Sequence, residues 1–130
     1  MSAVVDTNVL IFDTFEDSEH HKDATSKLDS LEKWHFPSIV FHELVWFFKA
    51  RNIPLARARL KLEEYMTNEK TVFISCTPDD IRFAATEMRS YRKYNDLLIL
   101  SAAKRLGHLL FTFDEELRKT AVENSVPLIK

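Results

Sequence analysis

Apolar residues along the chain fall into two kinds of segment. Short runs of β-branched and aromatic residues are bounded by polar or proline positions, and longer segments repeat apolar residues every three or four positions. The first pattern is typical of buried strands and the second of amphipathic helices. We therefore expect five strands, at Ala3–Val5, Trp34–Pro37, Thr71–Ser75, Leu109–Thr112 and Val126–Ile129.

Helical patterns fill the segments between the expected strands. Two carry clear boundary signals, because Thr77 and Pro78 suit the start of a helix and Gly107 suits the end of another. The expected helices are Thr7–Phe12, His20–Leu31, Ile39–Arg51, Leu55–Thr67, Asp80–Arg89, Tyr94–Arg105 and Asp114–Asn124. Strands that alternate with helices imply parallel pairing through right-handed crossovers. The sequence thus predicts a single α/β domain over residues 1–130, a three-layer α/β/α sandwich with a central parallel sheet of about five strands.

The composition is that of an ordinary globular domain, and it excludes several kinds of site. The 130 residues are 45% hydrophobic and 29% charged, with one glycine and one cysteine. Gly107 alone cannot build a glycine-rich phosphate loop, and Cys76, which we expect to be buried at a strand end, forms neither a disulfide nor a cysteine zinc site. We find no signal peptide and no bilayer-spanning run, and expect a cytoplasmic protein. With a net charge of −2, nucleic acid would bind only through local basic patches.

Two carboxylates come directly after expected strands. Asp6 follows the first strand, and Asp114 lies just past the fourth. Because parallel strands end at the same edge of a sheet, these two residues must share that edge, where open α/β sheets form their crevice. Taken singly, each acid is better explained as the N-cap of the helix that follows it.

Two further acids lie among apolar helical positions. Glu43 would share a helix face with Val40 and Trp46, and Asp96 begins a helix that is apolar nearly all round. Burying a carboxylate is costly unless it is neutralised or paired. An ion pair with a lysine or arginine would explain Glu43 structurally, and the favourable field of a helix N-terminus would explain Asp96.

The four acids taken as a set change this assessment. Like charges gathered at one sheet edge repel each other and raise each other's pKa values. A divalent cation removes that conflict, and carboxylate ligands without cysteine or clustered histidine suit Mg²⁺ or Mn²⁺. Such ions orient a water molecule and stabilise charge on phosphoryl oxygens. The set therefore favours a metal site suited to phosphoryl chemistry.

Four short motifs carry these acids in a fixed order. They are Asp6-Thr7-Asn8, His42-Glu43-Leu44, Asn95-Asp96-Leu97-Leu98-Ile99 and Thr112-Phe113-Asp114. In this order and at these spacings the motifs resemble those of the PIN-domain ribonucleases, and most of all the small single-domain VapC-type toxins of prokaryotic toxin–antitoxin pairs. Each motif is weak alone, and the four together are specific. The resemblance covers essentially the whole chain, from Ala3 to Ile129.

The resemblance implies an endoribonuclease that uses one or two Mg²⁺ or Mn²⁺ ions and releases a 3′-hydroxyl. It also implies an RNA substrate, a cognate antitoxin and a homodimer, although no residue identifies the dimer interface. Asn8 and Thr112 match polar positions that shape the pocket. The residues that match the family's metal-binding and catalytic acids are Asp6, Glu43, Asp96 and Asp114.

The chain departs from the family pattern at two places. Leu97 and Leu100 stand where smaller residues are common, which should affect packing more than chemistry. Some members carry another acid three residues after the fourth one, where this chain has Leu117. Glu115 or Glu116 could take its place, so the sequence leaves the second metal site open.

Basic and aromatic residues offer contacts for RNA. Arg92 and Lys93 lie just before Asp96, where they should rim the crevice and could hold phosphates, although a solvated helix face explains them equally well. Trp34 and the run Trp46-Phe47-Phe48 could stack on bases, and they are better explained as core residues.

Two other functions compete with catalysis on RNA. A PIN-like domain that binds RNA or a protein without cleaving would be expected to lack some of the four acids, and all four are present. A phosphoacceptor receiver domain needs an acidic pair after its first strand and an acceptor aspartate after its third. Here Thr7 and Asn8 follow Asp6, and Cys76 and Thr77 follow the third expected strand, so this fit is poor.

Overall fold

A four-stranded parallel sheet forms the middle of the molecule. The structure is a computed structural model that describes the whole chain, from Met1 to Lys130. The strands are β1 (Ser2–Val5), β2 (Lys33–Pro37), β3 (Thr71–Ile74) and β4 (Leu109–Phe111). Their order is β3-β2-β1-β4, and all neighbouring strands are parallel. The carboxyl ends of β1 and β4 therefore lie side by side.

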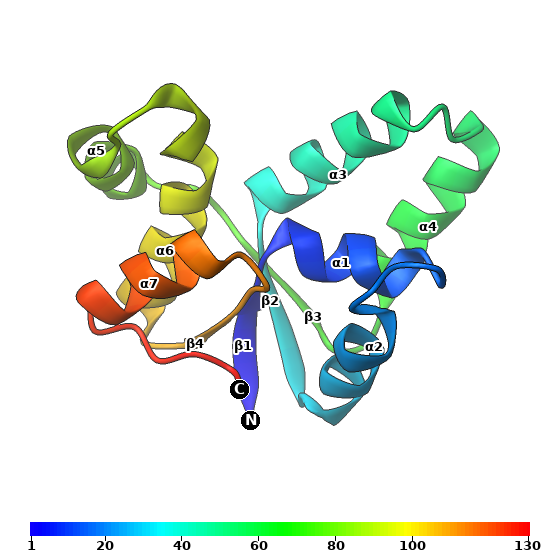
Figure 1. Ribbon diagram of the computed structural model, residues 1–130, viewed down its shortest axis with the longest axis horizontal. Helices are drawn as coiled ribbons and strands as arrows, with labels where there is room; N and C mark the ends of the chain where they lie inside the picture. Colours follow the sequence, from blue (N-terminus) through cyan, green and yellow to red (C-terminus); the bar gives the residue numbers. More distant parts are fainter.

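Helices cover both faces of this sheet. They are α1 (Thr7–Thr14), α2 (His21–Ser30), α3 (Ser38–Ala50), α4 (Leu55–Thr67), α5 (Pro78–Glu87), α6 (Tyr94–Leu106) and α7 (Glu115–Glu123), with a short 3₁₀ turn, η1 (Tyr91–Lys93), before α6. Figure 1 shows α5, α6 and α7 on one side of the sheet and α1, α2 and α4 on the other. The α/β/α sandwich predicted from the sequence is therefore confirmed.

The fifth expected strand, Val126–Ile129, does not form. The C-terminal segment meets β4 only through an isolated bridge between Leu110 and Leu128. Leu110 donates its N–H to the Pro127 carbonyl at 2.9 Å and accepts the Ile129 N–H at 2.9 Å. Pro127 has no N–H of its own, so the ladder cannot continue through it. The sheet consequently has four strands and not five.

The central strand and α6 are the most deeply buried elements. Ala3, Val4 and Val5 have no exposed surface, and residues 97–103 of α6 are all buried. A helix that is apolar on every side is expected where a sheet and other helices enclose it. It ends at Gly107, whose φ of 68° suits glycine because this residue has no Cβ. None of the helices combines the length and apolar character that crossing a membrane requires.

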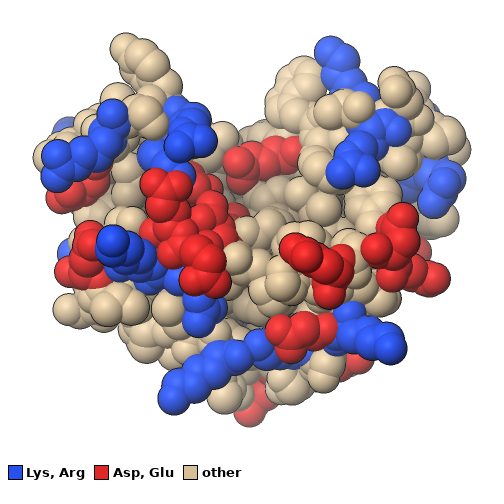
Figure 2. Space-filling view, in the orientation of Figure 1, with Lys and Arg blue, Asp and Glu red and all other residues tan.

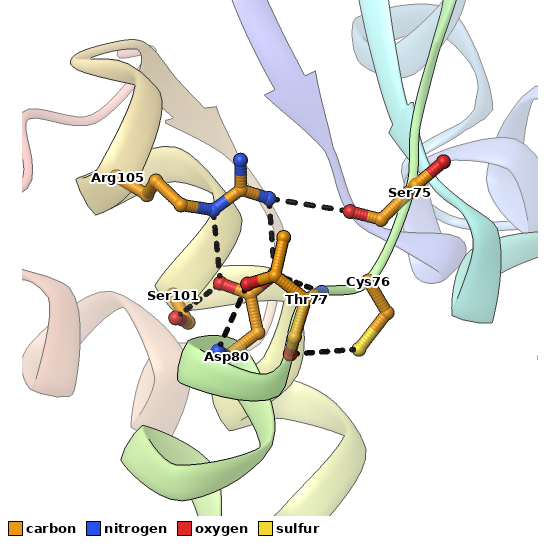
Figure 3. Close-up of polar contacts among 6 residues, drawn as sticks. All are labelled: Ser75, Cys76, Thr77, Asp80, Ser101 and Arg105. Carbon is orange, nitrogen blue, oxygen red and sulfur yellow. Dashed lines mark hydrogen bonds and ion pairs between the residues drawn. The ribbon is translucent and has the colours of Figure 1, made fainter.

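An ion pair between the buried Asp80 and the partly exposed Arg105 joins α5 to α6 (Figure 3). Asp80 accepts hydrogen bonds from Ser101 Oγ at 2.7 Å and from Arg105 Nε and Nη2 at 3.2 and 3.0 Å. Thr77 and Asp80 also form the capping box that begins α5. The neighbouring Cys76 is exposed, so the expectation of a buried cysteine is wrong, because β3 ends before reaching it.

Candidate metal centre

Four acids from four different elements converge above the carboxyl end of the sheet. Asp6 follows β1 and Asp114 follows β4, so their positions are fixed by the pairing of these two strands. Asp96 lies in the first turn of α6, and Glu43 lies in the second turn of α3. Figure 2 shows acidic side chains gathered beside a hollow between two arms of the molecule. The structure thus places the four acids at one end of the sheet, close enough for the charge of Asp96 to interact with those of Asp6, Glu43 and Asp114.

Asp6 is the most deeply buried of these acids, with 4% of its surface exposed. It caps α1 by accepting the Thr7 N–H at 2.7 Å, and its second oxygen accepts the Thr112 hydroxyl at 2.7 Å. Burial raises the pKa of Asp6 to about 7, and the negative charges of Asp96 and Glu43 act in the same direction. The hydrogen bond from Thr112 opposes this shift and does not cancel it. Being an N-cap therefore does not account for Asp6 by itself.

Glu43 is half-buried and has neutral partners only. Thr7 Oγ1 donates to its Oε1 at 2.6 Å, and Asn95 Nδ2 donates to its Oε2 at 3.4 Å. No lysine or arginine forms a salt bridge with it. The ion pair that would have explained this residue structurally is therefore absent.

Asp96 is the acid whose charge interacts with the others most widely. Burial raises its pKa to about 6, and the charges of Asp114, Glu43 and Glu116 add to that effect. The ammonium group of Lys93 opposes the rise and is too weak to reverse it. An acid at a helix N-terminus would normally be favoured in its charged form. Here the surrounding carboxylates and burial outweigh the helix dipole.

Asp114 combines the capping role with a free oxygen. Its Oδ1 accepts the N–H groups of Glu116 and Leu117 at 2.9 and 3.2 Å, which begins α7. Its Oδ2 forms no hydrogen bond within the protein and stays available to a ligand. Leu117, which stands where some relatives have a further acid, is buried in the core. Glu116 is therefore the α7 acid whose charge reaches Asp96.

Thr112 joins the ends of β1 and β4. Besides donating to Asp6, its hydroxyl accepts Asn8 Nδ2 at 3.2 Å and the Asp114 N–H at 3.1 Å. Asn8 in turn accepts the Phe113 N–H at 3.2 Å. These contacts join the start of α1 to the segment that follows β4.

Two positioning contacts were not anticipated from the sequence. Thr7 and Asn95 both hold the carboxylate of Glu43, although neither was assigned a role. Thr7 follows Asp6 and Asn95 precedes Asp96, and this adjacency is the only feature of the sequence that points to a role for them. A hydrogen bond between residues 36 or 52 positions apart depends on tertiary packing and could not be derived from local pattern.

The acids suit a hard divalent cation by residue type and charge, although they do not form a closed cage. No three histidine, cysteine, aspartate or glutamate side chains lie close enough together to enclose one ion. No salt bridge involves Asp6, Glu43, Asp96 or Asp114. Oxygen ligands with an uncompensated negative charge are what Mg²⁺ and Mn²⁺ prefer.

Of the two predicted phosphate contacts, Lys93 lines a pocket beside Asp96, and Arg92 precedes it in the 3₁₀ turn η1. Lys93 forms an ion pair with Glu116 and so links η1 to α7. A pocket of about 190 Å³ beside Asp96 is lined by this pair and by Arg89. Arg92 is exposed and has no ion-pair partner, so its guanidinium is free to contact an anion.

The aromatic residues divide between core and surface. Trp34 and Phe48 are buried, at 7% and 3% exposed, as a core role requires. Trp46 is 64% exposed, so it is not a core residue. It lies on α3 and borders an apolar pocket between α3 and α4.

Comparisons with known proteins agree with this architecture. A model of the PIN domain family matches residues 3–123. No curated protein sequence matches the chain significantly. Among solved structures, VapBC2 from Rickettsia felis bound to a promoter DNA fragment is similar at 17% identity and a TM-score of 0.70, covering 99% of this chain and 98% of that one.

Two further solved structures are similar over nearly their whole length. A toxin–antitoxin complex from Klebsiella pneumoniae gives 18% identity and a TM-score of 0.68, with 98% of this chain and 96% of that chain covered. FitAcB from Neisseria gonorrhoeae gives 20% identity and a TM-score of 0.66, with 100% of this chain and 97% of that chain covered. At these identities the likeness is one of fold.

Proposed function

This chain belongs to the PIN domain family, and from that premise we propose that it is an endoribonuclease dependent on Mg²⁺ or Mn²⁺. The observation that supports this most directly is the set of four acids at one end of the sheet, none of which forms a salt bridge. Burying negative charge without compensation costs stability, so a fold that keeps it has a use for a cation there.

In this proposal Asp6, Glu43, Asp96 and Asp114 supply the metal-binding oxygens. A divalent ion bound there provides the positive charge that activates water and stabilises phosphoryl oxygens. The protein's neighbouring residues hold the acids in place. Thr112 fixes Asp6, and Thr7 with Asn95 fixes Glu43.

Arg92 is the better placed of the two predicted phosphate contacts. It is exposed and has no ion-pair partner, whereas Lys93 is engaged by Glu116. Contacts of this kind position an RNA backbone without reading its sequence. We therefore expect reversing the charge of Arg92 to reduce the salt dependence of RNA affinity, and the same change at Lys93 to have a smaller effect.

Cleavage of single-stranded RNA by the purified protein in Mn²⁺ tests the enzyme assignment. The matched variants are Asp6→Asn in the site and Asp79→Asn, an exposed acid at the start of α5 that pairs only with Arg82. We expect cleavage by the parent and by Asp79→Asn, and none by Asp6→Asn or in EDTA. Equal cleavage by Asp6→Asn would contradict the assignment.

A PIN-like domain that binds without cleaving is the alternative, and the absence of a closed metal cage is the observation that favours it. Calorimetry with Mn²⁺ separates the two functions. Neither metal binding nor cleavage would support the binding domain, whereas metal binding without cleavage would leave the site functional and indicate a more selective substrate.

The fold neighbours suggest the setting in which such an enzyme would work. One of them is described as a toxin–antitoxin complex, and we propose that this chain is the toxin of a VapBC-type pair in the cytoplasm, where the single cysteine stays reduced. Expression of the chain should then arrest growth, and Asp6→Asn should abolish the arrest. We also propose a homodimer, which light scattering of the purified chain would test.

A further inference from the structure

Three aromatic rings pack together next to Asp114: Phe12 from α1, His20 just before α2, and Phe113 between β4 and α7. The His20 ring stacks on the Phe113 ring, with centroids 4.7 Å apart and planes only 11° apart. Phe12 packs against both of them, at centroid distances of 4.9 and 5.4 Å. This arrangement is a stacked pair with a third ring in contact.

Neither of the two aromatic rings that contact His20 covers the outer face of its ring. Phe12 is nearly perpendicular to both partners, at 73° to His20 and 85° to Phe113, and lies almost equally close to each. A ring stacked on the outer face of His20 would lie about twice as far from Phe113 as the His20 ring does. Phe12 is much closer to Phe113 than that, so it lies beside the stacked pair and not on top of it. The His20 side chain is accordingly 40% exposed.

The segment that presents His20 is held in place by hydrogen bonds. Ser18 Oγ donates to the carbonyls of Phe12 and Phe15 at 3.1 and 2.7 Å. His21 Nδ1 lies 2.8 Å from the same Phe12 carbonyl, and the His20 carbonyl accepts the Ala24 N–H at the start of α2. The His20 ring is therefore presented from an ordered segment, which reduces the entropy that would be lost when a ligand binds to it.

The stack is continuous with the acidic site through Phe113. This residue lies between Thr112, which holds Asp6, and Asp114, and its N–H donates to Asn8 at 3.2 Å. A nucleotide next to a phosphate bound at the acids would therefore have its base within the neighbourhood of the stack.

We propose that the His20 ring, backed by Phe113, is a stacking platform for one nucleobase of a single-stranded RNA. The inference rests on the proposed ribonuclease function and adds a subsite to it. Unpaired bases stack on aromatic and imidazole rings in RNA recognition, and the interaction tolerates any base because each has a π-face. A parallel pair of rings with no aromatic partner on the outer face of His20 offers a base the third place in the stack.

The test measures binding of single-stranded oligoribonucleotides that carry 2-aminopurine at each position in turn, with EDTA present to prevent cleavage. Stacking quenches 2-aminopurine, so we expect one position at which the parent protein quenches strongly. His20→Ala should lose that quenching and bind about five- to one-hundred-fold more weakly, in keeping with stacking at other single-strand sites. His20→Phe, which keeps an aromatic ring, should retain both.

Two controls separate stacking from a structural role. An oligonucleotide that lacks the base at the quenched position should bind the parent and His20→Ala equally. If His20→Ala instead loosens the loop, it should weaken the binding of this oligonucleotide and of the complete one. The second control is His108→Ala, which removes another stacked histidine. The His108 ring packs on the His35 ring with centroids 3.9 Å apart, and His108 lies at the amino end of β4, away from the acids. This variant should change neither the RNA affinity nor the quenching.

The outcomes distinguish the platform from the enzyme. If the parent protein cleaves RNA and His20→Ala matches its affinity and quenching at every position, the platform is refuted and the ribonuclease stands. If the parent protein neither binds nor cleaves RNA, the proposed function fails and the platform fails with it.

Discussion

Asp6 and Asp80 are buried to nearly the same extent, at 4% and 2% exposed, and each lies at the beginning of a helix. Asp80 receives the guanidinium of Arg105 and the hydroxyl of Ser101, and its pKa is lowered even though burial acts to raise it. Asp6 receives only neutral donors, and its pKa rises to about 7.

The difference shows what kind of burial indicates a functional site. Asp80 is a structural acid, because its charge is balanced within the fold and the pair joins α5 to α6 (Figure 3). Asp6 and Asp96 have raised pKa values, because burial and the neighbouring carboxylates outweigh what the chain offers in compensation, which for Asp96 is the nearby charge of Lys93. Burial alone is thus uninformative, and burial without a counter-charge is the observation that points to an external cation.

The largest expected effect comes from Asp96→Asn, which removes charge from the unbalanced group. Metal-assisted catalysis supplies several kcal/mol of transition-state stabilisation, so RNA cleavage should fall by at least about a hundredfold. The same change should raise the melting temperature of the metal-free protein, because it relieves repulsion with Asp114 and Glu43. Cleavage rates and thermal melts in EDTA check the two parts. Lower stability together with full activity would make Asp96 a structural acid like Asp80.

The identical chemical change at Asp80 should have the opposite outcome. Asp80→Asn leaves Arg105 and Ser101 with a neutral partner, and we expect a loss of about 2 kcal/mol in the free energy of unfolding. The figure is below that for a fully buried pair because the Arg105 side chain is 33% exposed. Urea denaturation gives the loss, and cleavage per folded molecule should be unchanged. Arg105→Lys keeps the charge and should recover part of the stability.

The contrast between these aspartates also shows how far the sequence could predict the site. Asp6 and Asp114 were found because each follows a strand, and parallel pairing carries them to one edge. The sequence also predicts a helix that begins at Asp80. The burial of Asp80 could not be foreseen, because Arg105 reaches it from another helix, 25 positions along the chain.

The errors in predicting the fold have a similar origin. The apolar pattern of Val126–Ile129 suits a strand, yet Pro127 limits pairing to a single bridge with β4. The stack of His20 on Phe113 joins residues from distant segments, and nothing in either local sequence indicates it. Periodicity predicts elements and their faces, whereas side-chain partners between elements require the packed structure.

The pH dependence of stability should separate the two aspartates by sign. An unfolded aspartate titrates near pH 4. Asp6 titrates at about 7 when folded, so the stability that comes from its bound proton is lost as pH rises from about 4 to 7. Asp80 has a lowered pKa, so its contribution is present above pH 4 and is lost as pH falls through its folded pKa.

Denaturation of the metal-free protein between pH 3 and pH 8 measures both slopes. Asp6→Asn should flatten the decline towards neutral pH, and Asp80→Asn should flatten the decline towards acid. If the decline in stability towards neutral pH is unchanged in Asp6→Asn, then Asp6 is not the group that titrates in that range. The proposed difference between Asp6 and Asp80 would then be wrong.

The smallest expected effect comes from removing the Thr112 hydroxyl, the neutral group that donates a hydrogen bond to Asp6. Thr112→Val keeps the shape of the side chain and removes the hydroxyl that donates to Asp6 and accepts from Asn8. We expect a loss of about 1 kcal/mol in unfolding free energy. The decline in stability towards neutral pH should also move to higher pH, since this hydroxyl lowers the pKa of Asp6. Thr112→Ser, which restores the donor, should reverse the pH shift. A hydroxyl can thus moderate the charge of Asp6 without balancing it, which is why the carboxylate remains available to a cation.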